Sequence, residues 1–120
     1  MLKNEEQNLD MDEEATIESQ FFEFAKMQNR QFPEPPRSGE TITLYRSDYW
    51  LRQAGILNDR SVHMNDTGIC YFKFNKSEIT LEEWFQMISD LCLVKDLDEL
   101  YVLTQLTNCG LPGQTVVIVP

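Results

Sequence analysis

The chain has 120 residues, of which 42% are hydrophobic and 11% aromatic, and its formal net charge at pH 7 is −10. This size and apolar content suit one globular domain with a single core. A strongly acidic chain lacks the concentrated basic surface that nucleic-acid phosphates require. The chain has neither a run of about 20 apolar residues that could span a membrane nor the basic and apolar regions of a secretion signal, so we expect a cytoplasmic protein.

The negative charge is concentrated at the N-terminus. Residues 1–20 carry seven acids and one base, a net charge of −6, whereas residues 21–94 carry ten acids and eight bases, a net charge of −2. Residues 1–12 have too little apolar surface to offset the entropy lost on ordering, so we expect a mobile acidic tail. Residues 13–113 are the predicted domain, and residues 114–120 form an apolar C-terminal segment.

A helix with an explicit start follows Ile79. Thr80 can cap the first free amides while Glu83 reaches back to the Thr80 amide, and Ile79 can pack against Trp84 across this cap. Apolar residues then recur at the spacing of one buried helical face: Leu81, Trp84, Phe85, Ile88, Leu91 and Cys92. The sequence therefore predicts a short extended segment that turns directly into an amphipathic helix.

The same pattern occurs 37 residues earlier. The letters ITL at 42–44 repeat those at 79–81, and Ser47 is the expected cap of a helix over 47–54 that buries Trp50 and Leu51. A helix, a loop with a central β-branched residue and a second helix, recurring after about 35 to 40 residues, is the plan of a paired EF-hand. We therefore expect a mainly α, degenerate paired EF-hand-like domain, with a two-stranded β pairing that places Ile42 beside Ile79.

The remaining helices are predicted from capping residues and apolar spacing. We expect a first helix from about Asp12 that buries Ile17, Phe21, Phe24 and Ala25, and a proline-rich loop over 32–36. Asn65 or Asp66 should cap a third helix that runs to about Phe74, and Asp96 should start a last helix through Leu97, Leu100, Tyr101 and Thr104 that ends at Gly110. The predicted core consists of Phe21, Phe24, Trp50, Leu51, Ile69, Phe72, Trp84, Phe85 and Ile88.

Neither loop is expected to bind calcium. With the β-branched residue at loop position 8, the first loop places Pro35, Arg37, Gly39 and Arg46 at positions 1, 3, 5 and 12, and the second places Phe72, Phe74, Lys76 and Glu83 there. Calcium takes six or more oxygen ligands, several of them anionic, and only Glu83 fits.

No catalytic or metal-binding constellation stands out. The single histidine, His63, has no second histidine as a partner, so zinc binding is not expected. We expect its imidazole to be exposed to solvent or to cap a helix. Cys70, Cys92 and Cys109 are expected to be small core residues kept reduced, with a reactive thiol as the alternative. There is no phosphate loop and no nucleophile elbow, so we expect a protein that is not an enzyme and needs no cofactor.

Several segments resemble one family. The run FFEFAK, the helix SDYWLRQAGILND, the segment NDTGICYF, the entry ITLEEW and the element NCGLPG, which together span residues 21–113, are similar to the core domain of the tubulin polymerization-promoting protein family. The resemblance implies a degenerate EF-hand fold, binding to tubulin, and promotion or bundling of microtubules. Some members are also reported to bind zinc or to hydrolyse GTP slowly.

Partner binding is assigned to the cations of the central helices. Arg46, Arg52, Arg60, Lys73 and Lys76 are the candidate basic face toward acidic tubulin tails, and ordinary surface charges are the alternative reading. Relatives continue into a basic, glycine-rich tail, whereas this sequence has the apolar letters TVVIV at 115–119. We expect this segment to form an added edge strand or a strip on the core, with a docking peptide as the alternative. The alternative function is an interaction module of the same fold that does not bind tubulin.

Overall fold

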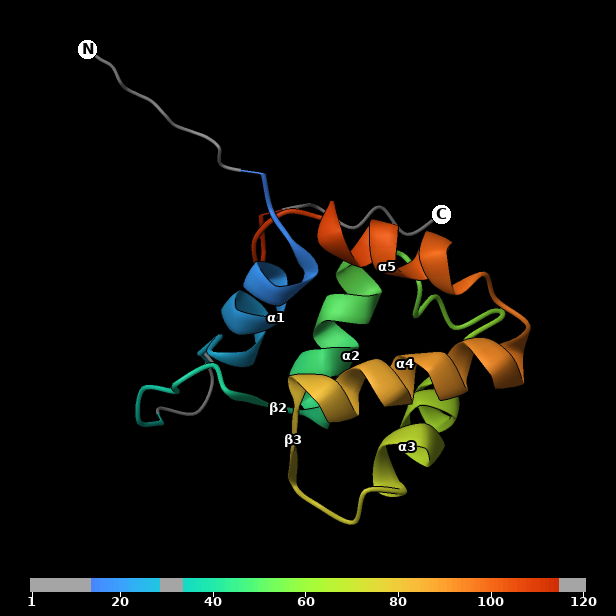
Figure 1. Cartoon of the computed structure of the whole chain (residues 1–120), viewed down its shortest axis with the longest axis horizontal. Helices are drawn as coiled ribbons and strands as arrows, with labels where there is room; N and C mark the ends of the chain where they lie inside the picture. Colours follow the sequence, from blue (N-terminus) through green and yellow to red (C-terminus); the bar gives the residue numbers. More distant parts are fainter. Residues whose placement is uncertain (1–13, 29–33, 115–120) are drawn as a thin grey trace.

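The computed structural model describes residues 14–28 and 34–114. Its elements are α1 (Ile17–Ala25), β2 (Thr41–Thr43), α2 (Leu44–Gln53), α3 (Met64–Phe72), β3 (Glu78–Thr80), α4 (Leu81–Lys95) and α5 (Glu99–Thr107) (Figure 1). The prediction of a mainly helical domain with one short β pairing is confirmed for this part of the chain. None of the described helices is both long and apolar enough to span a bilayer. The expected tail at 1–12 and the segment 115–119 lie outside the described residues.

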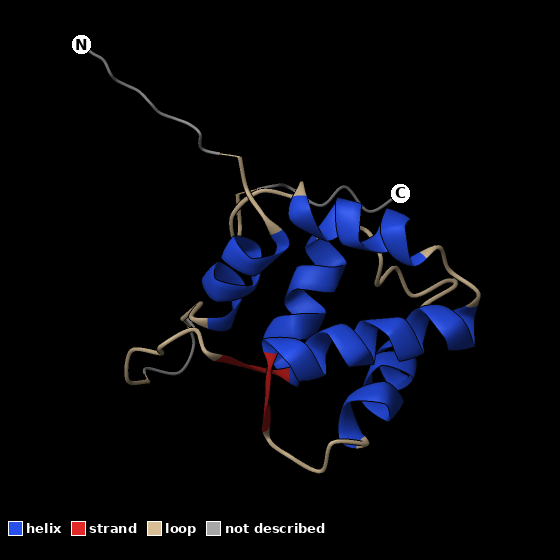
Figure 2. Ribbon diagram, in the orientation of Figure 1, coloured by secondary structure: helices blue, strands red, loops and turns tan. Residues whose placement is uncertain are grey.

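A two-stranded antiparallel sheet joins the two halves of the domain. Strands β2 and β3 pair with Ile42 opposite Ile79, as predicted, and both side chains are fully buried. Each strand runs without a break into the helix that follows it, as Figure 2 shows. The first unit is therefore α1, β2 and α2, the second is α3, β3 and α4, and α5 packs against α1 and α4.

Threonines at the ends of the strands start the two central helices. At α4 the Thr80 hydroxyl accepts the Glu83 amide at 3.2 Å and Glu83 accepts the Thr80 amide at 2.9 Å, so the predicted capping box is confirmed. At α2 the prediction of Ser47 as cap is wrong, because Thr43 accepts the Arg46 amide and the helix begins at Leu44. Ser47 is instead buried within the helix, where its hydroxyl accepts the indole N–H of Trp84 at 3.1 Å.

The other helices start at different residues from those expected. Residues 14–16 are not helical, and α1 begins after Thr16, which forms a capping box with Ser19; Asp12 lies outside the described residues. Helix α3 follows His63, whose amide is accepted by Asp66 from inside the first turn. Helix α5 is capped by Asp98 rather than Asp96, because Asp96 adopts a left-handed conformation (φ 56°) that ends α4. Four of the five helices thus start later or earlier than the sequence suggested, at a neighbouring polar residue.

An aromatic stack forms the centre of the core. The rings of Phe24 and Trp50 are parallel with centroids 5.1 Å apart, and those of Trp50 and Trp84 are parallel at 4.6 Å, while Phe21 meets both indoles edge-on. Stacked and edge-on ring pairs add about 0.5 to 1.5 kcal/mol each beyond their buried area. The predicted core residues that are buried are Phe21, Phe24, Trp50, Leu51, Trp84 and Ile88, and Phe85 is partly buried.

Helix α3 turns a different face inward from the one predicted. Ile69 and Phe72 are 67% and 66% exposed, so their assignment to the core is wrong. The buried stripe is Thr67, Cys70 and Tyr71, because the Tyr71 hydroxyl reaches two backbone carbonyl oxygens inside the domain and so buries a large ring without leaving its polar tip unsatisfied. Helix α5 contains Leu100, Tyr101 and Thr104 as predicted, with these three side chains exposed and with Val102 and Leu106 buried.

Candidate functional site

The loop between α1 and β2 is closed by the guanidinium group of Arg37. Its Nε donates to the carbonyl oxygen of Ala25 at 2.8 Å, and its Nη2 donates to the carbonyl oxygen of Thr41 at 3.3 Å and to Oε1 of Glu78 at 2.6 Å. The Arg37 side chain is 15% exposed. Arg37 therefore connects the C-terminal end of α1 to both strands. Its positive charge lies at position 3 of the first loop, where a calcium-binding loop would supply an oxygen ligand.

Arg46 closes the same loop from α2. Its Nε donates to the carbonyl oxygen of Met27 at 2.7 Å, and its Nη2 forms an ion pair with Glu34. The Arg46 side chain is only 6% exposed. The carbonyl groups at the end of a helix carry partial negative charge and lack partners within the helix. Arg37 and Arg46 therefore each donate to a carbonyl oxygen at or just after the end of α1.

The second loop is closed by weaker surface contacts and one buried hydroxyl. Lys76 Nζ lies 2.6 Å from Oε2 of Glu83 in a pair whose lysine is 53% exposed. The Tyr71 hydroxyl lies 3.0 Å from the carbonyl oxygen of Ile42 and 2.8 Å from that of Ser77. Burial, together with the nearby charge of Glu78, raises the pKa of Tyr71 to about 12. Tyr71 therefore stays a neutral hydrogen-bond donor that links the second unit to β2.

Among the described residues, acidic side chains do not converge in either loop. Within residues 14–28 and 34–114, no group of three or more His, Cys, Asp or Glu side chains is placed to hold a metal ion. In the calcium-loop register, position 3 of the first loop holds the Arg37 guanidinium, and Glu83 at position 12 of the second is engaged with Lys76 and the Thr80 amide. The absence of calcium binding stays a prediction, and these contacts are the physical reason for it.

The five cations assigned to partner binding do not share one surface. Arg46 is buried in the first loop and is therefore not available to a partner. Arg52 pairs with Asp59 at 2.8 Å, and Lys73 pairs with Asp90 at 2.8 Å. Arg60 is exposed and is the one member of the set without an ion pair among the described residues. Arg52 and Arg60 thus lie near the turn at 58–61, whereas Lys73 and Lys76 follow the C-terminal end of α3.

Exposed apolar side chains are a feature that the sequence reading missed. On α3, Ile69 and Phe72 lie three residues apart on one helical face and are both about two-thirds exposed. Other exposed apolar side chains lie at the end of α4 and the start of α5: Leu93, Val94, Leu100 and Tyr101. The spacing of Thr67, Cys70 and Tyr71 is the sequence signal that could have assigned α3 correctly, because it marks a second, competing face.

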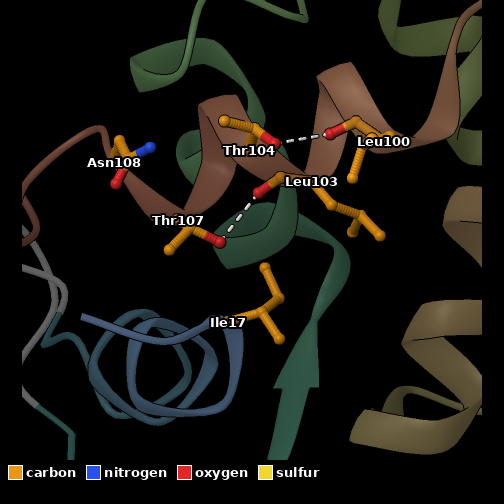
Figure 3. Close-up of a pocket in the computed structure, with 6 residues that line it drawn as sticks. All are labelled: Ile17, Leu100, Leu103, Thr104, Thr107 and Asn108. Atoms are coloured by element: carbon orange, nitrogen blue, oxygen red, sulfur yellow. Dashed lines mark hydrogen bonds between the residues drawn. The ribbon is translucent and has the colours of Figure 1, made fainter. Parts of the chain in front are cut away.

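A groove lies between the start of α1 and the outer face of α5. We call it the α1–α5 groove; its volume is about 290 Å³, and it is lined by Ile17, Leu100, Leu103, Thr104, Thr107 and Asn108. Figure 3 shows Ile17 facing α5 across this groove, with the hydroxyls of Thr104 and Thr107 turned back onto carbonyl groups of their own helix. None of the lining side chains is charged. The groove therefore presents a mainly apolar surface to whatever occupies it.

One buried carboxylate lies at the contact between the two units. Asp48 of α2 is 8% exposed, and its Oδ1 has no hydrogen-bond partner in the described part of the chain. Burial raises the pKa of Asp48 to about 6, although the Thr67 hydroxyl of α3 and the charge of Arg52 both act in the opposite direction. The hydroxyl of Thr67 donates to the Met64 carbonyl oxygen at 3.0 Å, so its oxygen remains able to accept a hydrogen bond from a protonated, neutral Asp48.

The histidine and the cysteines take the structural roles expected of them. His63 precedes α3 with its side chain 52% exposed, which agrees with the predicted exposed imidazole. The three thiols are free and buried, and burial raises the pKa of each, that of Cys92 to about 11. A reactive cysteine needs a lowered pKa and access to solvent. The prediction that Cys70, Cys92 and Cys109 are core residues is confirmed.

Comparisons with known proteins add no further assignment. No family model, no curated protein and no solved structure matches the chain. Function must therefore be argued from the residues and their arrangement.

Proposed function

We propose that this chain is a calcium-independent, degenerate paired EF-hand-like module that binds tubulin or microtubules and promotes their polymerization or bundling. The observation that carries the proposal is the antiparallel pairing of Ile42 with Ile79. Paired EF-hands are joined through the β-branched residues of their loops. The pairing of the two strands supports the proposal, because an EF-hand-like module of this family would join its two loops at these residues.

The closed loops support a module that does not respond to calcium. Arg37 and Arg46 already provide positive charge to the carbonyl and carboxylate oxygens around the first loop. A calcium sensor opens when the ion draws such oxygens together. In this chain arginine side chains make the corresponding contacts without the ion, so partner binding should not depend on calcium.

The proposed contacts with tubulin are the cations that remain accessible. Arg46 is buried and is therefore excluded from the proposed contacts. The remaining candidates are Arg52, Arg60, Lys73 and Lys76. Arg60 is the sharpest probe, since it is exposed and has no ion pair within the described residues whose loss would disturb the fold. Attraction to the acidic tails of tubulin acts mainly on the rate of encounter and is screened by salt.

Microtubule co-sedimentation of the full chain tests this function. Arg60→Glu should weaken binding about threefold, the size expected for one ion pair at the rim of an interface. Lys26→Glu is a control from outside this set of cations, because Lys26, whose side chain is 40% exposed, follows the end of α1 beside Glu23 and Phe22. Equal effects of the two reversals would discard the proposed surface, and no sedimentation of the full chain would discard tubulin as the partner.

The acidic N-terminus gives a second test of the same function. Residues 1–12 carry Glu5, Glu6, Asp10 and Asp12 against Lys3, a net charge of −3, and tubulin's tails are acidic as well. Deleting residues 1–12 should therefore tighten microtubule binding about twofold at low salt, and the difference should shrink as salt is added. Weaker binding of the truncated chain would show that the tail contributes contacts instead of repulsion.

A second candidate function is favoured by the exposed face of α3. Ile69 and Phe72 form an apolar pair on one helical surface, and such surfaces are typical of protein-binding sites. In this alternative the module binds another protein through α3. In that case the full chain should not sediment with microtubules. If it does sediment, Ile69→Ser and Phe72→Ser should leave binding unchanged when tubulin contacts the cations, and a loss of sedimentation would mean that tubulin itself contacts α3.

A further inference from the structure

The α1–α5 groove is an apolar surface that the proposed function does not use (Figure 3). Its α5 wall consists of residues at the spacing of one helical face: Leu100, Leu103, Thr104 and Thr107. Ile17 of α1 forms the opposite wall, and Leu100 is 74% exposed. Helix α5 buries a different face, that of Val102 and Leu106, so this stripe remains open to a partner on the described part of the chain.

The groove offers little that could orient a small polar molecule. The hydroxyls of Thr104 and Thr107 donate to carbonyl oxygens of their own helix at 2.7 and 2.8 Å, and none of the six lining side chains is charged. The volume of about 290 Å³ is also at the lower limit of small-molecule sites, which measure about 300 to 1,000 Å³. The groove therefore suits apolar side chains of a protein partner.

The charged side chains that accompany the two walls are all acidic. Residues 14–25, which include α1, carry three acids and no lysine or arginine, and residues 96–114, which include α5, also carry three acids and neither base. Four exposed acids are neighbours of groove residues in the sequence, and we call them the acidic rim: Glu14 and Glu18 on either side of Ile17, and Asp98 and Glu99 before Leu100. An apolar groove with an acidic rim favours a partner that carries apolar and cationic side chains together.

We propose that the α1–α5 groove binds a basic amphipathic helix of another protein. Apolar side chains of this helix, spaced three and four residues apart, enter the groove, and its lysines or arginines lie along the acidic rim. The stripe from Leu100 to Thr107 is about 10 Å long, so a helix of about three turns covers it. The opposite charges of helix and rim orient the partner and speed its association.

Other occupants fit this charge pattern less well. A second copy of the chain would bring two acidic rims together, and anionic lipid headgroups would be repelled in the same way. The acidic tails of tubulin would also be repelled. This surface is therefore separate from the proposed cation contacts, and the inference does not depend on them.

Titration of the full chain with a model peptide tests the proposal. The probe is an amphipathic peptide of about 15 leucines and lysines, a length at which an isolated helix is marginal and binding can complete it. Methyl signals of Ile17, Leu100 and Leu103 should shift, while the Ile69 methyl on α3 stays constant. A peptide of the same composition, with its leucines dispersed around the helix, should bind at least tenfold more weakly. Absence of binding, equal binding of the dispersed peptide, or shifts at Ile69 instead of the groove overturn the proposal.

The apolar wall is tested by one pair of variants. Leu100→Ser should weaken binding of the peptide about tenfold, because a leucine contact is lost. Ile69→Ser is the matched control, because Ile69 is 67% exposed on another helix, and it should leave binding unchanged. Both side chains are exposed, so both variants should keep the fold. Equal losses in the two variants would overturn the assignment to the groove.

The acidic rim is tested by a second pair. Glu14→Gln with Glu18→Gln should weaken peptide binding about fivefold at low salt, at roughly twofold for each rim ion pair. Glu40→Gln with Glu82→Gln removes the same charge from exposed positions before β2 and in the first turn of α4, and should have a smaller effect. Equal effects of the two double variants would mean that net charge alone attracts the peptide, which overturns the proposal.

Two further results would identify another occupant of the groove. Peptide binding that appears only after residues 115–120 are deleted would assign the groove to the chain's own end. Self-association of the full chain that shifts the same methyl signals without peptide would assign it to a second copy. Either result overturns the proposal, and neither depends on tubulin binding.

Discussion

The two helix–loop–strand units share one plan but are held together by different interactions. In the first unit, Arg37 and Arg46 are largely buried and donate to main-chain carbonyl oxygens at the end of α1. In the second unit, the loop is closed by the exposed pair of Lys76 with Glu83, and α3 leaves Ile69 and Phe72 in solvent. The pairing of β2 with β3 is thus common to both, and the way each loop is stabilised is not.

This difference has an energetic meaning. A buried cation that satisfies otherwise unpaired carbonyl groups is costly to remove, because it leaves those groups without partners. An exposed ion pair contributes little, because water and salt screen it. The first unit should therefore tolerate fewer substitutions in its loop than the second, and its helices should exchange amide protons more slowly.

The largest effect is expected from the ring that both units share. Trp84 is fully buried and stacks on Trp50, so Trp84→Ala should lower the free energy of unfolding by about 3 to 5 kcal/mol. Chemical denaturation measures this change. Leu93→Ala is the control, since Leu93 is 81% exposed and should cost less than about 0.5 kcal/mol. A loss below 1 kcal/mol at Trp84 would show that the stack is not the centre of stability.

The loops themselves can be compared by removing one cation from each. Arg46→Ala should lower the free energy of unfolding by about 3 kcal/mol, because Glu34 and the Met27 carbonyl oxygen lose a charged donor. Lys76→Ala should leave the free energy of unfolding close to that of the parent chain. Both are measured by denaturant unfolding at one pH. Equal losses at the two positions would remove the distinction between the units.

The contact between the units should be sensitive to pH through Asp48. Its pKa is raised to about 6 in the folded chain from 3.8, so the folded state binds the proton more readily than the unfolded state. Stability should therefore rise as the pH falls from 7 to 4.5, by about 2 kcal/mol. Glu78 and Glu83 have pKa values lowered from 4.5, so the stability that they provide starts to be lost near the lower end of this window and is lost mainly below it.

Asp48→Asn provides the comparison for this titration. The variant cannot titrate at this position, so its free energy of unfolding should change much less between pH 7 and pH 4.5 than that of the parent chain. Denaturant unfolding at four or five pH values measures both curves. Parallel curves for the two proteins would mean that Asp48 is hydrated in solution and does not oppose folding.

The smallest expected effect is that of calcium. Titration calorimetry at millimolar calcium should give no saturable heat, because Arg37 lies in the first loop and Glu83 is the one acidic ligand correctly placed in the second. Amide chemical shifts at 72–83 should stay constant during the same titration. A stoichiometric heat would show that the second loop binds the ion despite the lysine at its fifth position.

Elements with an explicit local signal were predictable from the sequence. Thr80 and Glu83 identify the start of α4, and the repeated ITL letters gave the pairing of Ile42 with Ile79. The faces of α3 and α5 were not predictable in the same way, because each helix carries two apolar stripes. The choice between Phe72 and Tyr71 depends on carbonyl groups of distant residues that accept from the Tyr71 hydroxyl.

The candidate site was predictable in its residue types more than in its geometry. The sequence shows five cations close together, but whether a given arginine faces solvent depends on tertiary partners such as Glu34 and the carbonyl oxygen of Met27. Sequence spacing carries no information about such partners. The exposure of Ile69 was hidden for the same reason, since an isoleucine at helical spacing is more often buried.

The rings of the aromatic stack come from both units, so each half of the chain needs the other to bury its rings. Phe21, Phe24 and Trp50 come from residues before the turn at 58–61, whereas Trp84 comes from a residue after it. A chain cleaved in that turn would yield two fragments, each with part of the stack and one unpaired strand. Neither fragment could bury its rings alone, but together they could reassemble. The domain thus has the construction of a split reporter, in which recovery of the folded state signals that two separate molecules have met.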